Sequence, residues 1–341
     1  MHMADALISP AAGGAMWAAT AGLIVYSAKK LKREGDDRKA PLMGVLGAFI
    51  FASQMINFSI PGTGSSGHLG GGMILSILLG PYAAFLVMAS ILTVQAFFFA
   101  DGGLLALGCN IFNMGFFPCF LAYPLIYRKI VGGSPTQGNI LTASVVSAVV
   151  GLQLGALGVV LETVSSGIAA LPFAKFVLLM QPIHLAIGIA EGLVTAAVVS
   201  FVWKARPEAL GGRLEARVSL RRIIVGFAMA AAVIGGVLSW FASADPDGLE
   251  WAMAKTSGQK EIAAPAGIRE ALAGLQEKVA FLPDYSFKAG DTASQEASVS
   301  AWPAVDPGTS LSGIVGGFLT LALACLIGFV LRARRVGASK V

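Results

Sequence analysis

The chain has 341 residues, of which 56% are hydrophobic and only 13% are charged, and its mean hydropathy is +0.76. A soluble domain carries about 25% charged residues, so this composition excludes an ordinary soluble protein and indicates a polytopic membrane protein. The three cysteines lie in apolar runs without a CxxC or a Cys/His cluster, which excludes a disulfide framework and a zinc module. The formal charge of +5 could suit nucleic acid, but its distribution along the chain argues otherwise.

Eight apolar runs are candidates for membrane spans, which need about 20 residues each. One of them, residues 69–100, has no charge, is too long for one span and is interrupted at Gly80-Pro81. Because proline removes a backbone donor and clashes with the preceding turn, we expect two short helices here and nine crossings in all. The runs are 13–28, 41–58, 69–100, 104–127, 140–161, 174–203, 223–242 and 311–331.

The basic residues set the expected orientation. Of the 24 Lys and Arg, 18 lie in four segments, and nine crossings place all four on the cytoplasmic side. The sequence therefore predicts an N-terminus outside and a C-terminus inside the bacterial cytoplasmic membrane, with the lipid bilayer and no nucleic acid as a partner. The four segments are 29–39, 128–129, 204–222 and 332–340.

The remaining polar stretch, residues 243–310, is placed outside by the same topology. It holds ten acidic and five basic residues and is rich in Ala, Gly, Ser and Pro, so we expect a mobile loop with one short helix near 269–279. The predicted fold is an all-α polytopic protein: a seven-span bundle over residues 1–205, a cytoplasmic linker over 206–222, and a two-span hairpin over 223–341 that carries this large loop.

The predicted chemistry lies at the outer face, where two of the three histidines fall. No basic region precedes the first apolar run, so we expect no cleaved signal peptide and a retained Met1. The α-amine of Met1, the backbone nitrogen and Nδ1 of His2, and the ring of His68 can form an all-nitrogen planar set. Such a set suits Ni(II) or Cu(II), and Co(II) less, and it binds more weakly at low pH. The alternative is a solvated His2 and a plain loop histidine at position 68.

Each of the other polar residues allows two interpretations. The glycines before His68 permit a tight re-entrant backbone, or they form a flexible connector. Asp101, Asn110 and Asn113 can orient ligand histidines, or they cap and link helices. His184 lies seven residues before Glu191 on one helix face, where we favour a polar pair that fixes this helix in the bundle over a functional role.

Two further hypotheses come from other classes of protein. The Gly64-Ser65-Ser66-Gly67 segment fits the GxSG pattern of rhomboid intramembrane proteases, with Ser66 as nucleophile and His184 as base, although the spacing after the histidine is one residue too long. The small-residue helices are also compatible with a structural or assembly subunit that carries no substrate.

The start of the chain, Met1-His2-Met3-Ala4-Asp5-Ala6, resembles the start of the nickel and cobalt S components of energy-coupling-factor transporters, with Ala6 in place of the usual glycine. The resemblance continues at 61–72, 101–115 and 184–195 and covers about the first 205 residues. The last 120 or so residues resemble the accessory N component, notably at 246–251 and 282–285. The chain thus resembles a fused M–N protein, and it is more similar to the nickel branch than to the cobalt branch.

The resemblance implies a metal held by the N-terminal amine, the nitrogens of the second residue and a loop histidine, which correspond to Met1, His2 and His68. It implies a non-enzymatic subunit without a prosthetic group, which captures Ni(II), or alternatively Co(II). A transmembrane coupling (T) subunit and cytoplasmic ATPases are the implied partners, since the chain has no GxxxxGK[ST] motif. The residues expected to support the ligands through hydrogen bonds are Asp5, Ser66, Asp101, Asn110 and Asn113.

Overall fold

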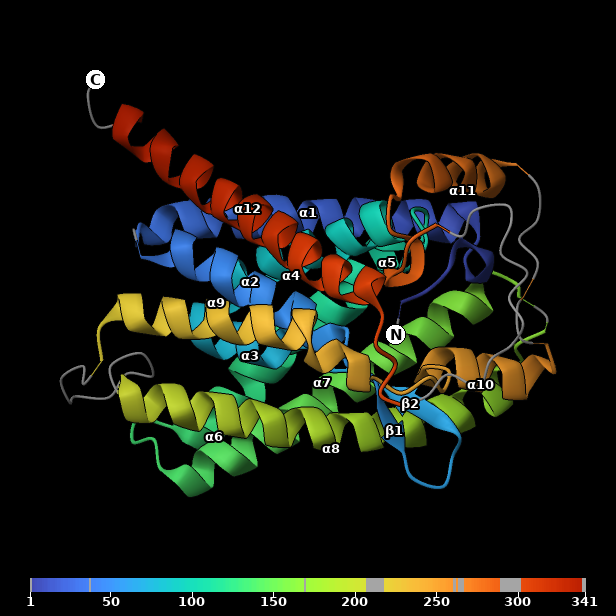
Figure 1. Ribbon diagram of the computed structural model, residues 1–341, viewed down its shortest axis with the longest axis horizontal. Helices are drawn as coiled ribbons and strands as arrows, with labels where there is room; N and C mark the ends of the chain where they lie inside the picture. Colours follow the sequence, from blue (N-terminus) through green and yellow to red (C-terminus); the bar gives the residue numbers. More distant parts are fainter. Residues whose placement is uncertain are drawn as a thin grey trace.

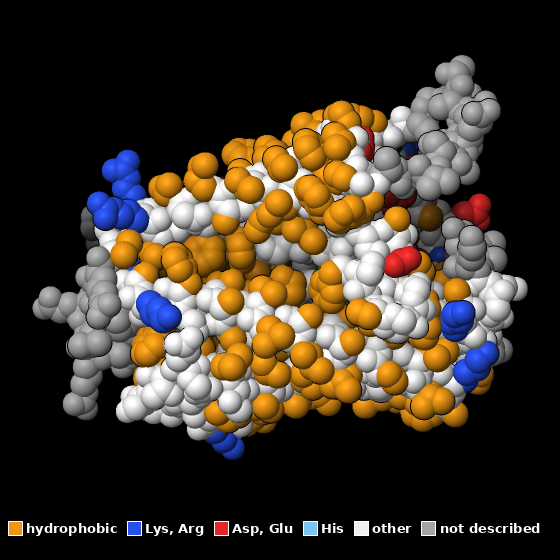
Figure 2. Space-filling model, turned by 60° about the horizontal axis from the view of Figure 1, so that its bottom comes forward, with side chains coloured by type: hydrophobic (Ala, Val, Ile, Leu, Met, Phe, Trp, Pro, Cys, Tyr) orange, Lys and Arg blue, Asp and Glu red, His pale blue; other side chains and the backbone are white. Residues whose placement is uncertain are grey.

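The computed structural model of the protein describes residues 2–36, 38–168, 170–206, 218–259, 262, 267–288 and 302–338. Long helices lie side by side along one axis of the molecule (Figure 1). On the face shown in Figure 2, hydrophobic side chains cover the middle, and the charged side chains are found toward its two ends. An apolar belt between two charged ends is the surface that a lipid bilayer requires.

The N-terminal module begins with a buried segment that contains the short helix η1 (Asp5–Leu7). Its α1 starts at Pro10, where Ser9 accepts a hydrogen bond from the Ala12 N–H (3.2 Å) and proline occupies the first helical position. The later elements are α2 (Lys39–Gln54), β1 (Phe58–Ile60), β2 (Ser65–Gly67), α3 (Gly72–Leu79), α4 (Pro81–Phe99), α5 (Leu107–Ile111), the π-helical η2 (Phe112–Tyr127), α6 (Arg128–Val131), α7 (Gln137–Ser165) and α8 (Phe173–Ala205), with α1 ending at Glu34.

The break predicted at Gly80-Pro81 is present. Helix α3 ends at Leu79, Gly80 has a φ of +81°, and α4 begins at Pro81. The eight residues of α3 reach only about 12 Å at 1.5 Å per residue, far short of a span. Before α3 the chain forms the antiparallel β1–β2 hairpin, which the sequence analysis did not predict.

Six helices in the described part of the chain are long and apolar enough to cross a membrane. Helices α2 and α9 have 16 and 17 residues and are slightly shorter than the others. A predominantly helical polytopic class is therefore confirmed, with the β1–β2 hairpin as an exception to the all-α prediction, whereas the seven-span bundle with a two-span hairpin stays a prediction. The six are Pro10–Glu34, Pro81–Phe99, Leu107–Val131, Gln137–Ser165, Phe173–Ala205 and Pro307–Arg332.

The C-terminal module consists of α9 (Leu220–Gly236), η4 (Leu238–Phe241), α10 (Gly248–Ser257), α11 (Ile268–Val279), η5 (Pro283–Tyr285) and α12 (Pro307–Ala338). Helices α9 and α12 pack on α2, and α10 and α11 lie at the end of the molecule that also carries the β hairpin (Figure 1). We call this end the hairpin end and the opposite end, which carries Lys39 and Arg128, the basic end.

The predicted helix near 269–279 is confirmed as α11, but the mobile loop expected around it is wrong for much of 243–288. Asp247 caps α10 by accepting from the Leu249 and Glu250 N–H groups (both 2.8 Å), and Glu250 accepts from the Asp247 N–H in return. This capping box is a helix signal in the sequence, but the prediction followed the overall composition of the loop and missed it.

Candidate metal-binding site

The N-terminal segment, residues 2–9, is inserted into the hairpin end of the bundle. Asn110 Oδ1 accepts from the Met3 N–H (2.8 Å), and Asn110 Nδ2 donates to the Met3 carbonyl (3.2 Å). The Gly103 N–H donates to the same carbonyl at 2.9 Å. The backbone is therefore fixed one residue after His2. Three apolar side chains of the segment are buried: Met3, Leu7 and Ile8.

Two further contacts fix the rest of this segment. Asp5 Oδ1 accepts from the Ala106 N–H (3.0 Å), and a Cβ on Gly103 would overlap the Asp5 side chain. Arg269 of α11 donates through Nε and Nη2 to the Ile8 carbonyl at 2.9 and 2.5 Å. The C-terminal module therefore helps to hold the segment that carries His2.

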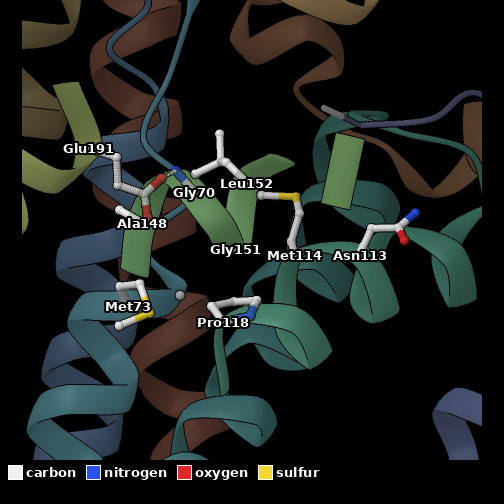
Figure 3. Close-up of a pocket in the computed structure, with 10 residues that line it drawn as sticks. Gly70, Met73, Asn113, Met114, Pro118, Ala148, Gly151, Leu152 and Glu191 are labelled. Carbon is white, nitrogen blue, oxygen red and sulfur yellow. Dashed lines mark hydrogen bonds between the residues drawn. The ribbon is translucent and has the colours of Figure 1, made fainter. Parts of the chain in front are cut away.

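His68 lies on the loop between the β hairpin and α3. Its Nδ1 is 3.1 Å from the Leu69 carbonyl oxygen, which can only accept, so the proton is on Nδ1 and the lone pair is on Nε2. Glu191 of α8 fixes the same loop by accepting from the Gly70 and Gly71 N–H groups at 2.8 and 3.1 Å. Figure 3 shows the carboxylate meeting Gly70 beside a small cavity.

The side chains of His2, His68 and Asp101 form one cluster. The two imidazole rings are stacked, with centroids 5.2 Å apart and planes 5° apart. His2 Nδ1 lies 3.0 Å from Asp101 Oδ1, and His2 Nε2 is buried without a hydrogen-bond partner in the described part of the chain. The structure thus brings two residues of the predicted ligand set together, beside a carboxylate predicted to orient them.

A cavity of about 830 Å³ lies beside these histidines, and both modules line it. Its described lining holds six carboxylates and no Lys or Arg. Carboxylates of one sign in a cleft raise the local concentration of counter-ions, so the cavity favours a cation next to His2 and His68. The six are Asp5, Asp101, Asp247, Glu250, Asp284 and Asp306.

Burial and neighbouring charges set the protonation of the cluster. Burial raises the pKa of Asp101, but His2 and the Tyr285 hydroxyl outweigh it and bring that pKa to about 2. Burial lowers the pKa of His68 to about 3. Burial also raises the pKa of Asp247, yet His68 and the Glu250 N–H leave it below its ordinary value. At neutral pH His68 is therefore uncharged, and a metal can bind it without displacing a proton from Nε2.

The C-terminal module also forms a wall of the site. The Ser66 N–H donates to the Pro246 carbonyl (2.8 Å), and Ser66 forms a parallel bridge with Asp247. Trp251 Nε1 donates to the Thr63 carbonyl at 3.0 Å in the turn of the hairpin. The hairpin that precedes His68 is thus held against α10.

The other predicted residues are placed as follows. Asp5 and Asn110 hold the N-terminal segment, as described. Asn113 does not approach His2, because its amide donates to Glu162 of α7 at 2.7 Å. Met1 lies outside the described residues. Within the described ranges no three His, Cys, Asp or Glu side chains form a metal site by themselves.

Three residues at the site were missed by the sequence analysis: Asp247, Arg269 and Tyr285. Asp247 could have been found from its capping box. Arg269 was recognised only as part of a short helix, and nothing in the local sequence indicates that its guanidinium reaches Ile8. Tyr285, whose hydroxyl donates to Asp101 Oδ2 at 2.5 Å, lies in the 282–285 segment that resembles the N component, but that resemblance did not indicate a contact with Asp101.

The protease alternative is not supported. The Ser66 hydroxyl donates to the Asp245 carbonyl at 2.8 Å, and His184 Nδ1 is bonded to the Met180 carbonyl of its own helix at 2.7 Å. Neither contact pairs the two residues as nucleophile and base, a geometry that serine hydrolysis requires.

A helical bundle with two histidines and six carboxylates around one cavity is compatible with a membrane protein that handles cations. The chain belongs to the family described as "Cobalt uptake substrate-specific transmembrane region", whose profile matches residues 2–209. The profile of the PDGLE domain matches residues 221–333, and residues 246–250 read Pro-Asp-Gly-Leu-Glu. The same residues form the capping box of α10 beside the site.

Relatives of known name support this assignment. The chain is 32% identical to the "Putative fused nickel transport protein NikMN" of Archaeoglobus fulgidus, over 95% of this chain and 96% of that one. It is also 32% identical to the "Fused nickel transport protein NikMN" of Rhodobacter capsulatus, over 84% and 88%. The "Cobalt transport protein CbiM" of Sorangium cellulosum is 29% identical over 62% of this chain and 94% of that one.

A solved structure shares the fold over about three fifths of the chain. The crystal structure of a transition metal transporter matches with a TM-score of 0.54 and 30% identity, over 61% of this chain and 94% of that one. The resemblance to a fused M–N protein of the nickel and cobalt transport class is therefore confirmed.

Proposed function

We propose that this chain is the substrate-binding membrane subunit of an energy-coupling-factor importer and that it captures Ni(II) at the hairpin end for ATP-driven uptake. The observation that carries the proposal is the His2–His68 pair, stacked at the wall of an acidic cavity. The proposed ligands are the Met1 amine, the backbone nitrogen and Nδ1 of His2, and Nε2 of His68.

The chemistry of this proposed set favours nickel over cobalt. Four nitrogen donors in a plane suit Ni(II), and the affinity of such sites for divalent metals rises from Co(II) to Ni(II). The carboxylates of the cavity attract any divalent cation, so they raise the capture rate without choosing the metal. The selection therefore comes from the nitrogens of His2 and His68.

Co(II) is the alternative substrate. The relatives include proteins named for nickel transport and proteins named for cobalt transport, and the family description names cobalt. Titration of the purified chain with Ni(II) in the presence of excess Co(II) distinguishes the two, since a nickel protein loses little nickel under this competition.

The energy for uptake comes from partners in this proposal. We infer a T subunit and cytoplasmic ATPases, because the chain carries no P-loop motif. We place the N-terminus outside and the C-terminus inside the cytoplasmic membrane, with modules at 1–205 and 223–341 joined by the basic linker 206–222. This orientation directs the cavity toward the side from which the metal arrives.

The decisive experiment is measurement of bound Ni(II) by isothermal titration and elemental analysis on the full chain. We expect His2→Ala, His68→Ala and a chain with one residue added before Met1 to weaken binding by more than about 100-fold, the upper end of the effect of losing a supporting residue. Lys129→Ala is the control, since this exposed side chain lies at the basic end of the molecule, and it should bind as the wild type does. Wild-type nickel content in His2→Ala and His68→Ala would overturn the proposed site.

A further inference from the structure

One carboxylate links the C-terminal module to His2. Asp101 lies in the turn between α4 and α5, with its Oδ1 3.0 Å from His2 Nδ1 and its Oδ2 2.5 Å from the Tyr285 hydroxyl. Asp101 comes from the N-terminal module and Tyr285 from η5 of the C-terminal module. The carboxylate therefore has one strong partner from each module.

Tyr285 is held in place independently of this bond. Its ring stacks on Phe99 with centroids 5.0 Å apart and planes 15° apart, and it meets the edge of Phe51 at 6.3 Å. The Leu282 N–H donates to the Phe98 carbonyl at 3.3 Å just before it. The hydroxyl can thus be removed without removing the packing of the ring.

The backbone at this point is strained. Asp284 and Tyr285 have φ values of +50° and +60°, a region that residues other than glycine rarely adopt. Strain of this kind persists where the surrounding structure fixes the backbone, and it is concentrated at functional sites. Here it brings the Tyr285 hydroxyl to Asp101.

The His2 nitrogen bonded to Asp101 is the nitrogen that the proposed metal set uses. An imidazole Nδ1 carries either a proton, which it donates to a carboxylate, or a metal. Capture of the metal at Nδ1 therefore breaks the Nδ1–H bond, forms an Nδ1–metal bond, and releases the proton to water in the cavity. Asp101, only 23% exposed, then loses its partner in the N-terminal module.

We propose that Tyr285 is a positioning residue for metal capture, which acts by keeping Asp101 hydrogen-bonded when His2 exchanges it for the metal. This inference rests on the proposed function. A largely buried carboxylate without a hydrogen-bond donor is costly, so the hydroxyl lowers the cost of the exchange and stabilises the loaded state. The C-terminal module thereby contributes to affinity without supplying a ligand.

The test is Ni(II) titration of the full chain with Tyr285→Phe, which removes one oxygen and keeps the ring between Phe99 and Phe51. We expect affinity to fall by about 10- to 100-fold, the range for a residue that supports a metal ligand. Tyr127→Phe is the matched control, because this buried hydroxyl lies at the basic end and has no hydrogen-bond partner in the described part of the chain. It should bind within about twofold of the wild type.

The route through Asp101 is tested by a double-mutant cycle. Asp101→Asn removes the negative charge, so the loss of the Tyr285 hydroxyl no longer leaves a buried carboxylate without a donor. Adding Tyr285→Phe to this variant should therefore change nickel affinity by less than about twofold. Wild-type affinity in Tyr285→Phe would overturn the inference, and so would an equal loss in the Asn background, which indicates a structural role only. If His68→Ala binds nickel normally the proposed function itself fails. If His68→Ala loses nickel and Tyr285→Phe does not, only this inference fails.

Discussion

The two modules meet in two places, and the two contacts are built in opposite ways. Between the long helices, α12 lies against α2 through residues with little or no side chain. At the hairpin end, polar side chains of the C-terminal module donate to backbone carbonyls of the N-terminal module. The first contact depends on glycines that let the helices approach closely, and the second depends on side-chain hydrogen-bond donors. Enlarging a glycine should therefore break the first, and removing a donor should break the second.

The helix contact is a pair of small-residue stripes that run in opposite directions. Gly316 admits the ring of Phe51, and a Cβ on Gly44 would overlap the Cys325 sulfur. Small residues allow helix backbones to approach closely in a membrane, where packing replaces the hydrophobic effect. The stripes are Ala40, Gly44, Gly47 and Ala48 on α2, and Gly316, Thr320, Ala324 and Gly328 on α12.

The contact at the hairpin end recognises the main chain. Gln276 donates to the Ala96 and Gly102 carbonyls at 2.8 and 2.7 Å, and Arg269 donates to the Ile8 carbonyl. A carbonyl is present at every residue, so the bonds of Gln276 and Arg269 constrain the backbone path of the N-terminal module, whereas Tyr285 contacts one of its side chains, Asp101. It can therefore be weakened in steps while the bundle stays folded.

The largest expected effect comes from filling the helix contact. In Gly316→Leu the new side chain meets Phe51, which is fully buried and cannot move aside, so α12 must separate from α2. We expect the free energy of unfolding in detergent to fall by about 3 kcal/mol, the upper part of the range for overpacking. The change is measured as a shift of the unfolding curve.

Gly226→Leu is the matched control for this substitution. Gly226 is exposed on α9 and a Cβ there has no neighbour within 4 Å, so its unfolding curve should stay close to that of the wild type. An equal shift of the unfolding curve in both variants would show that helix propensity or detergent contact, rather than the contact between α2 and α12, causes the loss of stability.

The helices were predictable from the sequence because hydropathy and the Gly80-Pro81 break are local signals. His2, His68 and Asp101 were also found as candidates, because few histidines and carboxylates lie in the apolar part of the chain and each is therefore informative. The β1–β2 hairpin was missed, since its three-residue strands are short and the glycines of its turn suggested only an irregular loop.

The contact that the C-terminal module makes at the hairpin end was not predictable in the same way. The composition of residues 243–310 indicated a mobile loop. The order was missed because the stabilising bonds of Arg269, Gln276 and Tyr285 connect residues more than 170 positions apart. The acceptors are mostly backbone carbonyls, which leave no pattern in a single sequence. Only the capping box of α10 was a local signal.

A medium effect is expected from Arg269→Ala, which removes both hydrogen bonds to the Ile8 carbonyl. Bonds from a charged donor contribute about 1.5–3 kcal/mol, and here they hold residues 2–9 rather than the helices. We expect hydrogen exchange in the N-terminal peptide to become faster and nickel affinity to fall, while the unfolding curve moves less than in Gly316→Leu.

Arg269→Lys separates charge from geometry in this contact. Lysine keeps the charge but has no planar pair of donors, so it should restore only part of the protection of residues 2–9. Unchanged exchange of the N-terminal peptide in Arg269→Ala would contradict the view that α11 holds this segment.

The smallest effect is expected from Trp251→Phe at the edge of the hairpin contact. The substitution removes the bond to the Thr63 carbonyl and keeps an aromatic ring against the apolar cluster of Ile60 and Ile187. A neutral hydrogen bond contributes about 0.5–1.5 kcal/mol, so hydrogen exchange in the hairpin turn should increase while nickel affinity changes by less than about tenfold.

Trp302→Phe is the control, since this residue is 71% exposed, and it should leave the turn protected from exchange. A large loss of nickel in Trp251→Phe alone would mean that the hairpin, and through it His68, depends on α10 far more than one hydrogen bond allows.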